Sequence, residues 1–220
     1  MEEIFELNKY FPYSITEPDQ RNYILHHLDN IQKCIENNLY SSAFPHLHIV
    51  YMSFVYFQLL RISKEKNIEF NLCWIGFPNE EKDFLTKPDS PFSFHRIKEK
   101  TVFRFFRLLG LTDSSISNIS SVVNNRNEAL HANGLINCST EHEFINEVNN
   151  YLRVMDKIIG EELLFIQPIY ERISDTFDKD YTMTQDDIEI SFGSFSLIEL
   201  DILTKDKSDV VSNYIKENII

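Results

Sequence analysis

Residues 49–60 read IVYMSFVYFQLL and form the longest apolar run in the chain. The run is well short of the ~20 residues that a membrane-spanning helix requires. It therefore predicts a helix inside a protein core, which extends over residues 42–64. A chain of 220 residues that is 43% hydrophobic can build such a core in one domain and still carry an extension.

Further helices are expected on both sides of this segment. After Asp19, which can cap a helix, apolar residues recur every three or four positions. Thr140 and Glu143 form a capping-box pattern in front of another amphipathic run. Residues 66–92 hold three prolines and scattered aromatic residues, which predicts a long, partly irregular connection. The fold class is therefore all-α, and the expected bundle has about five helices, over residues 19–37, 42–64, 94–109, 113–132 and a segment that starts at Thr140.

The C-terminal part has a different composition. Residues 170–220 hold twelve acidic and five basic side chains, which accounts for more than half of the formal net charge of −13. Residues 188–203 alternate between apolar and polar side chains around Gly193, a pattern typical of a short β-hairpin. We expect a helical domain over residues 1–173 and a short acidic C-terminal extension over residues 174–220, with the hairpin inside it.

Composition argues against several classes of function. The five glycines are too scattered to form a phosphate-binding loop. Three cysteines without a Cys-x-x-Cys pair support neither a disulfide framework nor a thiolate zinc site. His46 and His48 diverge on a helix, and the spacing of His131, Cys138 and His142 matches no common zinc pattern. With no secretion signal visible, we expect a cytoplasmic protein without metal ion, cofactor or membrane segment.

The pattern Arg-Asn, three residues, His occurs twice, from Arg21 to His26 and from Arg126 to His131. Helical wheels at ~100° per residue separate the two copies. In the first copy, Asn22 and His26 fall opposite the apolar stripe of their helix and are expected to face water. In the second copy, Arg126 lies on an apolar stripe, where a buried charge needs a partner. The members of that stripe are Ile116, Ile119, Val123 and Leu130.

The second copy reads RNEALH over residues 126–131 and resembles the motif of the HEPN superfamily, an Arg and a polar residue followed by His. The expected helix order is similar too, because in that family the motif lies on a late helix of a small all-α bundle, after two long antiparallel helices. The resemblance covers residues 19–169. It implies a HEPN-like, metal-independent endoribonuclease that acts as a homodimer. Such proteins are often toxins or antiviral defence effectors, which implies a cognate antitoxin or a defence-system partner.

These residue types suit RNA cleavage. The 2′-hydroxyl of RNA can attack the neighbouring phosphorus, so an enzyme needs only to move protons and to stabilise extra negative charge. His131 can transfer protons near neutral pH. Arg126 can hold phosphate oxygens, and Asn127 can orient the imidazole or bind the phosphate. Arg126 and His131 are ~140° apart around a helix, so two chains facing across a two-fold axis would bring each Arg close to the His of the other chain.

Other interpretations of the same residues remain open. Arg126 can be a structural arginine that bridges helices, and His131 can interact with the last carbonyl groups of its helix. The main alternative function is a non-catalytic HEPN-type module that dimerises and recruits a partner protein or a nucleotide. A helical scaffold without any site is the third interpretation.

The acidic net charge opposes RNA binding, because nucleic-acid binders are usually basic. The predicted helix over residues 94–109 is a local exception. We expect its basic side chains to contact the RNA backbone, although an ordinary solvated helix face has the same pattern. On this helix Arg96, Lys100, Arg104 and Arg107 fall within ~80° of one another, with Phe103 among them.

Overall fold

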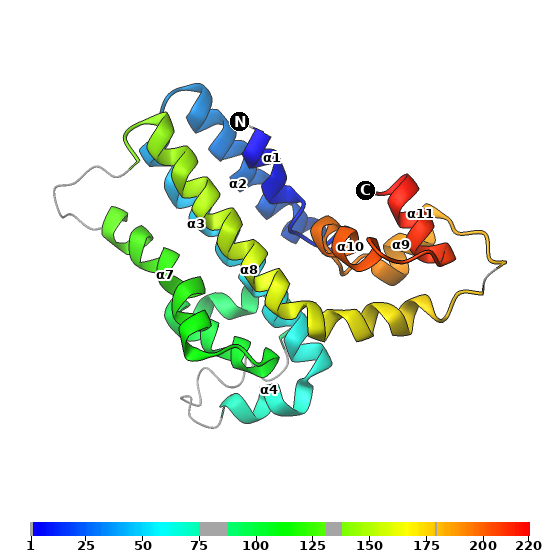
Figure 1. Ribbon diagram of the computed structural model, residues 1–220. Helices are drawn as coiled ribbons and strands as arrows, with labels where there is room; N and C mark the ends of the chain where they lie inside the picture. The colour runs from blue at the N-terminus through cyan, green and yellow to red at the C-terminus, as the bar shows by residue number, and fades with distance from the viewer. Residues whose placement is uncertain (1, 75–87, 131–137, 179) are drawn as a thin grey trace. The chain divides into compact units, whose positions relative to one another are not determined.

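The computed structural model describes residues 2–74, 88–130, 138–178 and 180–220, without the side chains of residues 2, 3, 5 and 124–130. Figure 1 shows the helices in chain order. Every regular element in these ranges is a helix, beside one isolated antiparallel bridge between Pro12 and Ser196. The predicted all-α class is thus confirmed for the described residues.

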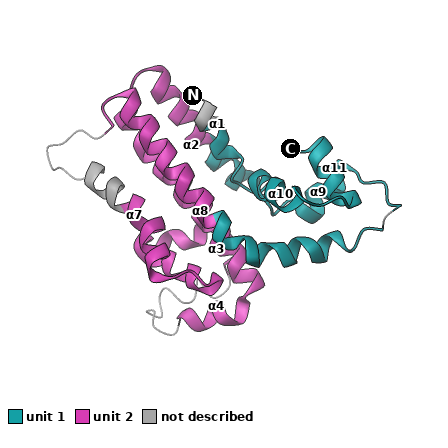
Figure 2. Ribbon diagram, in the orientation of Figure 1, with its two compact units in different colours: residues 1–25, 159–220 teal, residues 26–158 magenta. Residues whose placement is uncertain are grey.

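The chain divides into two compact units (Figure 2). Unit 1 consists of residues 1–25 and 159–220, and unit 2 of residues 26–158. Two helices contribute to both units, α2 (Pro18–Glu36) and α8 (Glu141–Ser174). The predicted domain boundary, between residues 173 and 174, falls inside unit 1, which is built from both ends of the chain.

Unit 2 is built around α3 (Tyr40–Glu65), the helix predicted from the apolar run. Residues 50–56 are all buried, so this helix is covered on every side over two turns. A short connection joins α2 to α3, and the contact between His27 and His46 shows that the two helices form an antiparallel hairpin. Tyr40 near the start of α3 contacts Phe144, and Tyr51 further along α3 contacts Tyr151. Because the contacts advance along both helices in the same direction, α8 runs parallel to α3.

The segments after α3 differ from expectation. A helix, α4 (Asn67–Cys73), lies inside the predicted irregular connection. The single helix predicted over residues 94–109 is wrong, because the backbone at Ile97 and Lys98 has ψ angles of 143° and 127°, which interrupt a helix. The segment instead forms η2 (Pro91–Arg96), α6 (Glu99–Val102) and η3 (Phe103–Leu109).

Apolar spacing explains why η3 adopts the tighter 3₁₀ form. Val102, Phe103, Phe105 and Phe106 are all buried. In a 3₁₀-helix the side chains at positions i and i+3 align, so these four residues form two neighbouring apolar columns on the core. Gly110, with a φ of 90°, ends the segment as predicted. The next helix, α7 (Asp113–Leu130), agrees with the predicted one and packs against α6 and η3.

The β-hairpin predicted over residues 188–203 is wrong, because two helices cover this stretch: α9 (Gln185–Phe192) and α10 (Leu197–Thr204). Each begins with a capping box, in which a Ser or Thr hydroxyl and the side chain of an acidic residue satisfy the first backbone N–H groups. Ile188 and Phe192, four positions apart, are buried, whereas Ile190 between them is 85% exposed. The burial therefore follows the helical period and not the alternation of a strand.

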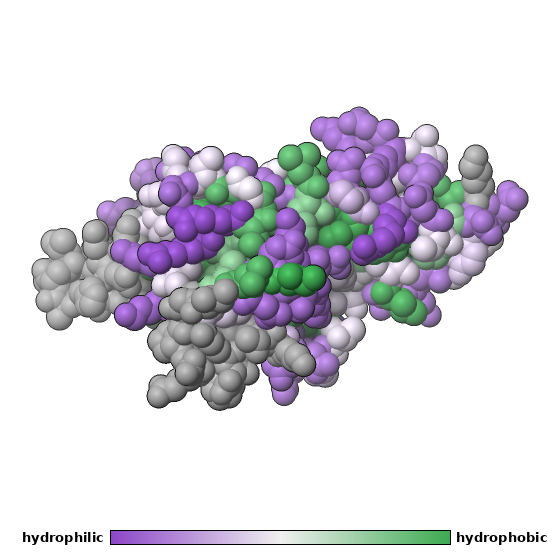
Figure 3. Space-filling model, turned by 90° about the horizontal axis from the view of Figure 1, so that it is seen from below, coloured by the Kyte–Doolittle hydropathy of each residue, from purple (hydrophilic) through white to green (hydrophobic). Residues whose placement is uncertain are grey.

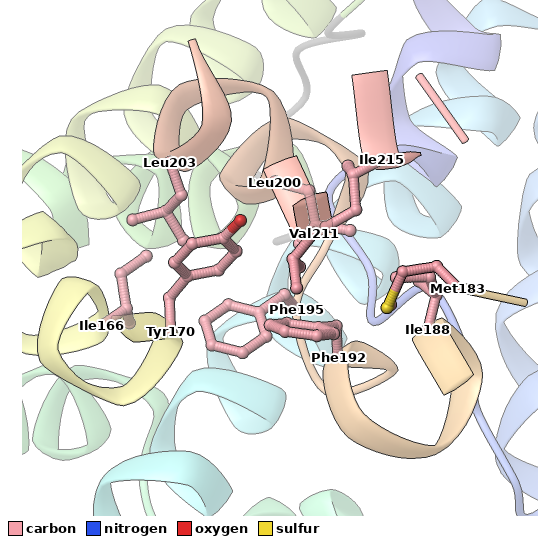
Figure 4. Packing of buried hydrophobic residues seen from close by; sticks show 10 residues of the cluster. All are labelled: Ile166, Tyr170, Met183, Ile188, Phe192, Phe195, Leu200, Leu203, Val211 and Ile215. Atoms are coloured by element: carbon pink, nitrogen blue, oxygen red, sulfur yellow. The ribbon is translucent and has the colours of Figure 1, made fainter. Parts of the chain in front are cut away.

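The hydrophobic core of unit 1 is shown in Figure 4. Helix α8 contributes Ile166 and Tyr170, and the Tyr170 hydroxyl forms a hydrogen bond of 2.8 Å with the Ser212 hydroxyl. Ser212 lies on α11 (Val210–Asn218), the last helix of the chain. The other members of the core are Met183, Ile188, Phe192, Phe195, Leu200, Leu203, Val211 and Ile215.

The N-terminal part of the chain completes unit 1. After α1 (Glu2–Asn8), the backbone N–H groups of Tyr13 and Ser14 donate to the carbonyl oxygens of Phe195 and Gly193, at 2.7 Å and 3.0 Å. A Cβ atom at Gly193 would lie 2.2 Å from a backbone oxygen and 2.7 Å from the Ser14 side chain. Glycine at this position is therefore what allows the N-terminal segment to approach.

The face shown in Figure 3 is largely hydrophilic, with hydrophobic side chains in separate patches. Large apolar side chains that are exposed include Leu164, Ile190 and Ile68. Scattered exposed apolar residues of this kind are normal for a folded protein. Among the described helices, none combines the length and the apolar character that crossing a membrane demands.

Candidate functional site

The predicted catalytic residues belong to the end of α7 and to the segment that follows it. The backbone of Arg126 and Asn127 is helical, as predicted. The side chains of both residues, and His131 altogether, lie outside the described residues. The arrangement of these three side chains therefore stays a prediction.

The described part of α7 has the predicted orientation. Ile116, Ile119 and Val123, the first three members of its apolar stripe, are all buried. The hydroxyl of Tyr51 on α3 donates to the carbonyl oxygen of Ile119 at 2.6 Å. The helix that carries the motif is thus anchored on the central helix of unit 2.

The first copy of the pattern faces solvent, as predicted. Arg21, Asn22 and His26 are all exposed. The His26 Nε2 atom lies 2.9 Å from the side-chain nitrogen of Asn30, one turn further along α2. This arrangement is that of an ordinary exposed helix face.

The four basic residues predicted to contact RNA are all exposed, and together they are named the basic surface: Arg96 in η2, Lys100 in α6, and Arg104 and Arg107 in η3. They do not form the stripe of one α-helix that the spacing predicts, because the extended backbone at Ile97 and Lys98 separates Arg96 from the others. Arg104 and Arg107 share one face of η3, since side chains three positions apart align in a 3₁₀-helix.

Phe103 does not lie among these basic side chains, contrary to the prediction. Its side chain is fully buried. The ring stacks on Tyr51 with ring centroids 6.1 Å apart and on Phe106 with centroids 6.4 Å apart. Phe103 therefore belongs to the core beneath the basic surface.

The charge of the basic surface is partly neutralised. Arg107 Nε donates to the Asp113 carboxylate at 3.0 Å, at the first residue of α7. Lys100 and Arg104 form no ion pair within the part of the chain that the structure describes. As far as the described residues go, the positive charge without an ion-pair partner thus lies at Lys100 and Arg104.

A buried polar network holds this segment on the core. The Nδ1 atom of His48, on α3, lies 3.0 Å from the Tyr151 hydroxyl, and its Nε2 atom lies 3.1 Å from the Glu99 carboxylate. Since a carboxylate only accepts, Nε2–H donates to Glu99, and Nδ1 is hydrogen-bonded to the Tyr151 hydroxyl. The network connects α3, α8 and the first residue of α6, directly before Lys100. The sequence holds no signal for it, because the three residues are far apart in the chain.

A second histidine cluster joins α2 to α3. The Nδ1 atoms of His27 and His46 are 2.8 Å apart, and the His26 and His27 ring centroids are 5.4 Å apart. Burial, followed by the charges of His46 and His26, lowers the pKa of His27 to about 4. Burial also lowers the pKa of His46. Both rings are therefore neutral at neutral pH. The sequence shows the pair His26-His27, but only the register of the helical hairpin places His46 beside it.

The described residues offer little support for nucleophilic or metal-centred chemistry. Burial, together with Glu147 and Glu143, raises the pKa of the Cys138 thiol to about 12, so this thiol stays protonated and unreactive at neutral pH. Among these residues, no three His, Cys, Asp or Glu side chains are grouped to hold a metal ion.

No protein-family model, curated protein or solved structure matches this chain.

Proposed function

We propose that the chain is a metal-independent endoribonuclease of HEPN type, in which Arg126, Asn127 and His131 act on an RNA strand held by the basic surface. The observation that supports this most is the arrangement of unit 2, where two of the elements that carry the basic surface pack against α7, the helix that carries the motif. An RNA-cleavage motif and exposed positive charge thus occur together in a chain that is acidic overall.

In the proposed reaction the 2′-hydroxyl of one nucleotide attacks the adjacent phosphorus and the 5′-oxygen leaves. His131 transfers a proton, and Arg126 stabilises the additional negative charge on the phosphorane. Asn127 orients the imidazole or binds a phosphate oxygen. The products are a 2′,3′-cyclic phosphate and a 5′-hydroxyl end, and no bound metal takes part.

The length of α7 can be compared with a length of RNA. Arg107 is bonded to Asp113 at the start of the helix, and Arg126 lies thirteen positions further on. At 1.5 Å per residue the two ends are about 20 Å apart. Phosphates of one strand are spaced by about 3.4 Å along a duplex axis, so a strand in that conformation reaches both ends with about six nucleotides, and a more extended strand needs fewer.

The proposed active form is a homodimer. Five positions separate Arg126 from His131, or about 140° around a helix, so a helix that ran through both residues would direct their side chains apart. Pairing of two chains across a two-fold axis brings an Arg from one chain to the His of the other. A cognate antitoxin or a defence-system partner is proposed on the family resemblance alone.

The decisive experiment compares matched substitutions in the two copies of the pattern. The protein is incubated with total RNA or tRNA in EDTA, and cleavage and end groups are analysed. We expect cleavage that His131→Ala lowers by about 10²- to 10⁴-fold, because a proton-transfer group is lost. Arg126→Ala is expected to be at least as damaging.

Arg21→Ala and His26→Ala are the matched controls and should leave cleavage unchanged, since both side chains are exposed. Strict dependence on Mg²⁺ or Zn²⁺ would contradict the mechanism. Absence of cleavage with any RNA favours the non-catalytic binding module, which recruits a partner protein or nucleotide.

The role of the basic surface is tested by charge reversal. Lys100→Glu with Arg104→Glu should weaken RNA binding and flatten its dependence on salt, because fewer counterions are released. Lys9→Glu with Lys33→Glu is the control, since both lysines are exposed and already pair with carboxylates. Equal binding by the two double variants would remove the basic surface from the proposal.

Light scattering tests the dimer. A species of twice the 26.0 kDa chain mass is expected at micromolar concentration. A monomer both with and without RNA would exclude an active site shared between two chains.

A further inference from the structure

His27 and His46 lie outside the proposed ribonuclease machinery, and their arrangement suggests a separate binding site. We propose that these two histidines, from α2 and α3, bind one divalent transition-metal ion of the Ni²⁺ or Cu²⁺ type. Water completes the coordination. The ion cross-links the helical hairpin and takes no part in the reaction proposed above.

The distance between the two ring nitrogens favours this class of metal. Two nitrogens that are each about 2.0 Å from a metal lie about 2.8 Å apart when they subtend a right angle, and about 3.3 Å apart at the tetrahedral angle. The Nδ1 atoms of His27 and His46 are 2.8 Å apart. The pair therefore matches adjacent positions of a square-planar or octahedral site, which Ni²⁺ and Cu²⁺ prefer, better than the tetrahedral geometry of Zn²⁺.

The positions of the two rings allow an ion to enter. His27 is buried, with 8% of its surface exposed, whereas His46 is half-buried. To converge on a metal, each nitrogen lone pair turns by about 45° from the line that joins the two atoms. Water completes the coordination from the side of the half-buried His46 in this proposal.

His26, the third ring of the cluster, has its Nε2 atom 2.9 Å from Asn30. It is not needed as a ligand, which agrees with the absence of any three-residue metal group among the described residues.

The test titrates tag-free protein, freed of metals with EDTA and then dialysed, with Ni²⁺ alone. Isothermal titration calorimetry, the melting temperature and the proton NMR signals of the ring N–H groups are recorded. We expect one equivalent of Ni²⁺ to bind, to raise the melting temperature, and to give two paramagnetically shifted ring N–H signals. Binding should weaken in acid, because protons compete with the metal for the ring nitrogens.

The variants His46→Ala and His27→Asn should each abolish this equivalent. His46→Ala keeps the test valid if the buried His27 variant fails to fold, and circular dichroism checks folding of both. His142→Ala is the matched control, because it removes an exposed histidine elsewhere. Retention of the bound equivalent in His46→Ala, or no binding by the wild type while folded, overturns the proposal and leaves the pair as a plain hydrogen bond.

Discussion

At the scale of single residues, unit 2 contains two buried histidines whose ring nitrogens have polar partners. His27 and His48 are both nearly inaccessible, yet their partners differ. His48 has a carboxylate and a hydroxyl at its two ring nitrogens, whereas His27 has another imidazole. A ring buried beside two other histidines disfavours a positive charge.

The stability of the protein should therefore fall in acid through His27. Its pKa is about 4 in the folded chain and 6.5 in the unfolded chain, so the unfolded state binds more protons below pH 6.5. The contribution of His27 is complete above pH 6.5 and is lost as the pH falls through 4. At about 1.4 kcal/mol per pKa unit, the loss amounts to a few kcal/mol.

Urea unfolding between about pH 7.5 and pH 4 measures this loss. The free energy of unfolding should decline less steeply in His27→Gln than in the wild type. The control His95→Gln, an exposed histidine on η2, should keep the wild-type slope. Identical slopes for His27→Gln and the wild type would contradict the prediction.

Glu99 is expected to stabilise unit 2 through the buried ring of His48. Glu99→Ala removes the acceptor 3.1 Å from His48 Nε2 and leaves a buried N–H group without this partner. The expected cost is about 1–3 kcal/mol of unfolding free energy. The exposed Glu141→Ala is the control and should change little. A change below about 0.5 kcal/mol in Glu99→Ala would show that the network is dispensable.

At the scale of elements, hydrogen bonds at the helix ends favour a helix where the apolar pattern alone does not distinguish a helix from a strand. Residues 188–203 have an alternating pattern, and yet the chain forms α9 and α10. Ser196 shows why: it accepts from the Glu199 backbone N–H at 3.2 Å, and the Glu199 carboxylate accepts from the Ser196 backbone N–H at 2.8 Å. These bonds satisfy donors that a helix start otherwise leaves unpaired.

Ser196→Ala should therefore destabilise the protein by about 1 kcal/mol, the usual cost of a lost N-cap. Thermal unfolding followed by circular dichroism measures the change. Ser117→Ala, at an exposed position inside α7, should be neutral or slightly stabilising, because alanine favours helices. Equal melting temperatures for Ser196→Ala and Ser117→Ala would show that the cap contributes nothing.

At the scale of the whole molecule, the first 25 residues and the last 62 build one unit together. Ile166 and Tyr170, which precede the predicted boundary at residue 173, are fully buried by residues that follow it. The acidic extension is thus part of a packed core and not an appended tail.

A chain shortened to residues 1–173 should be clearly less stable than the full chain. The truncation removes eight of the ten buried members of the unit 1 core shown in Figure 4 and exposes Ile166 and Tyr170. We expect a lower melting temperature and strong binding of a hydrophobic dye. A chain that lacks only Ile220, which is 52% exposed, is the control. Unchanged melting of the shortened chain would show that unit 1 does not depend on its C-terminal helices.

Strong periodic patterns were enough to predict α2, α3, α7 and the start of α8, because each of these helices buries one continuous apolar face or is buried all round. The exposure of Arg21 and His26 also followed from their positions opposite apolar neighbours, whereas the four basic residues are exposed on a segment that is not the single helix predicted for them. The catalytic roles of Arg126, Asn127 and His131 remain predictions from the sequence motif.

Only the tertiary structure decided the remaining features. The break at Ile97 and Lys98 and the joining of both chain ends depend on which surfaces are available for packing. The contacts of His48 with Tyr151 and of His27 with His46 join residues 103 and 19 positions apart. A periodic pattern specifies which side of an element is buried, whereas the partner across the core is set by the arrangement of the helices.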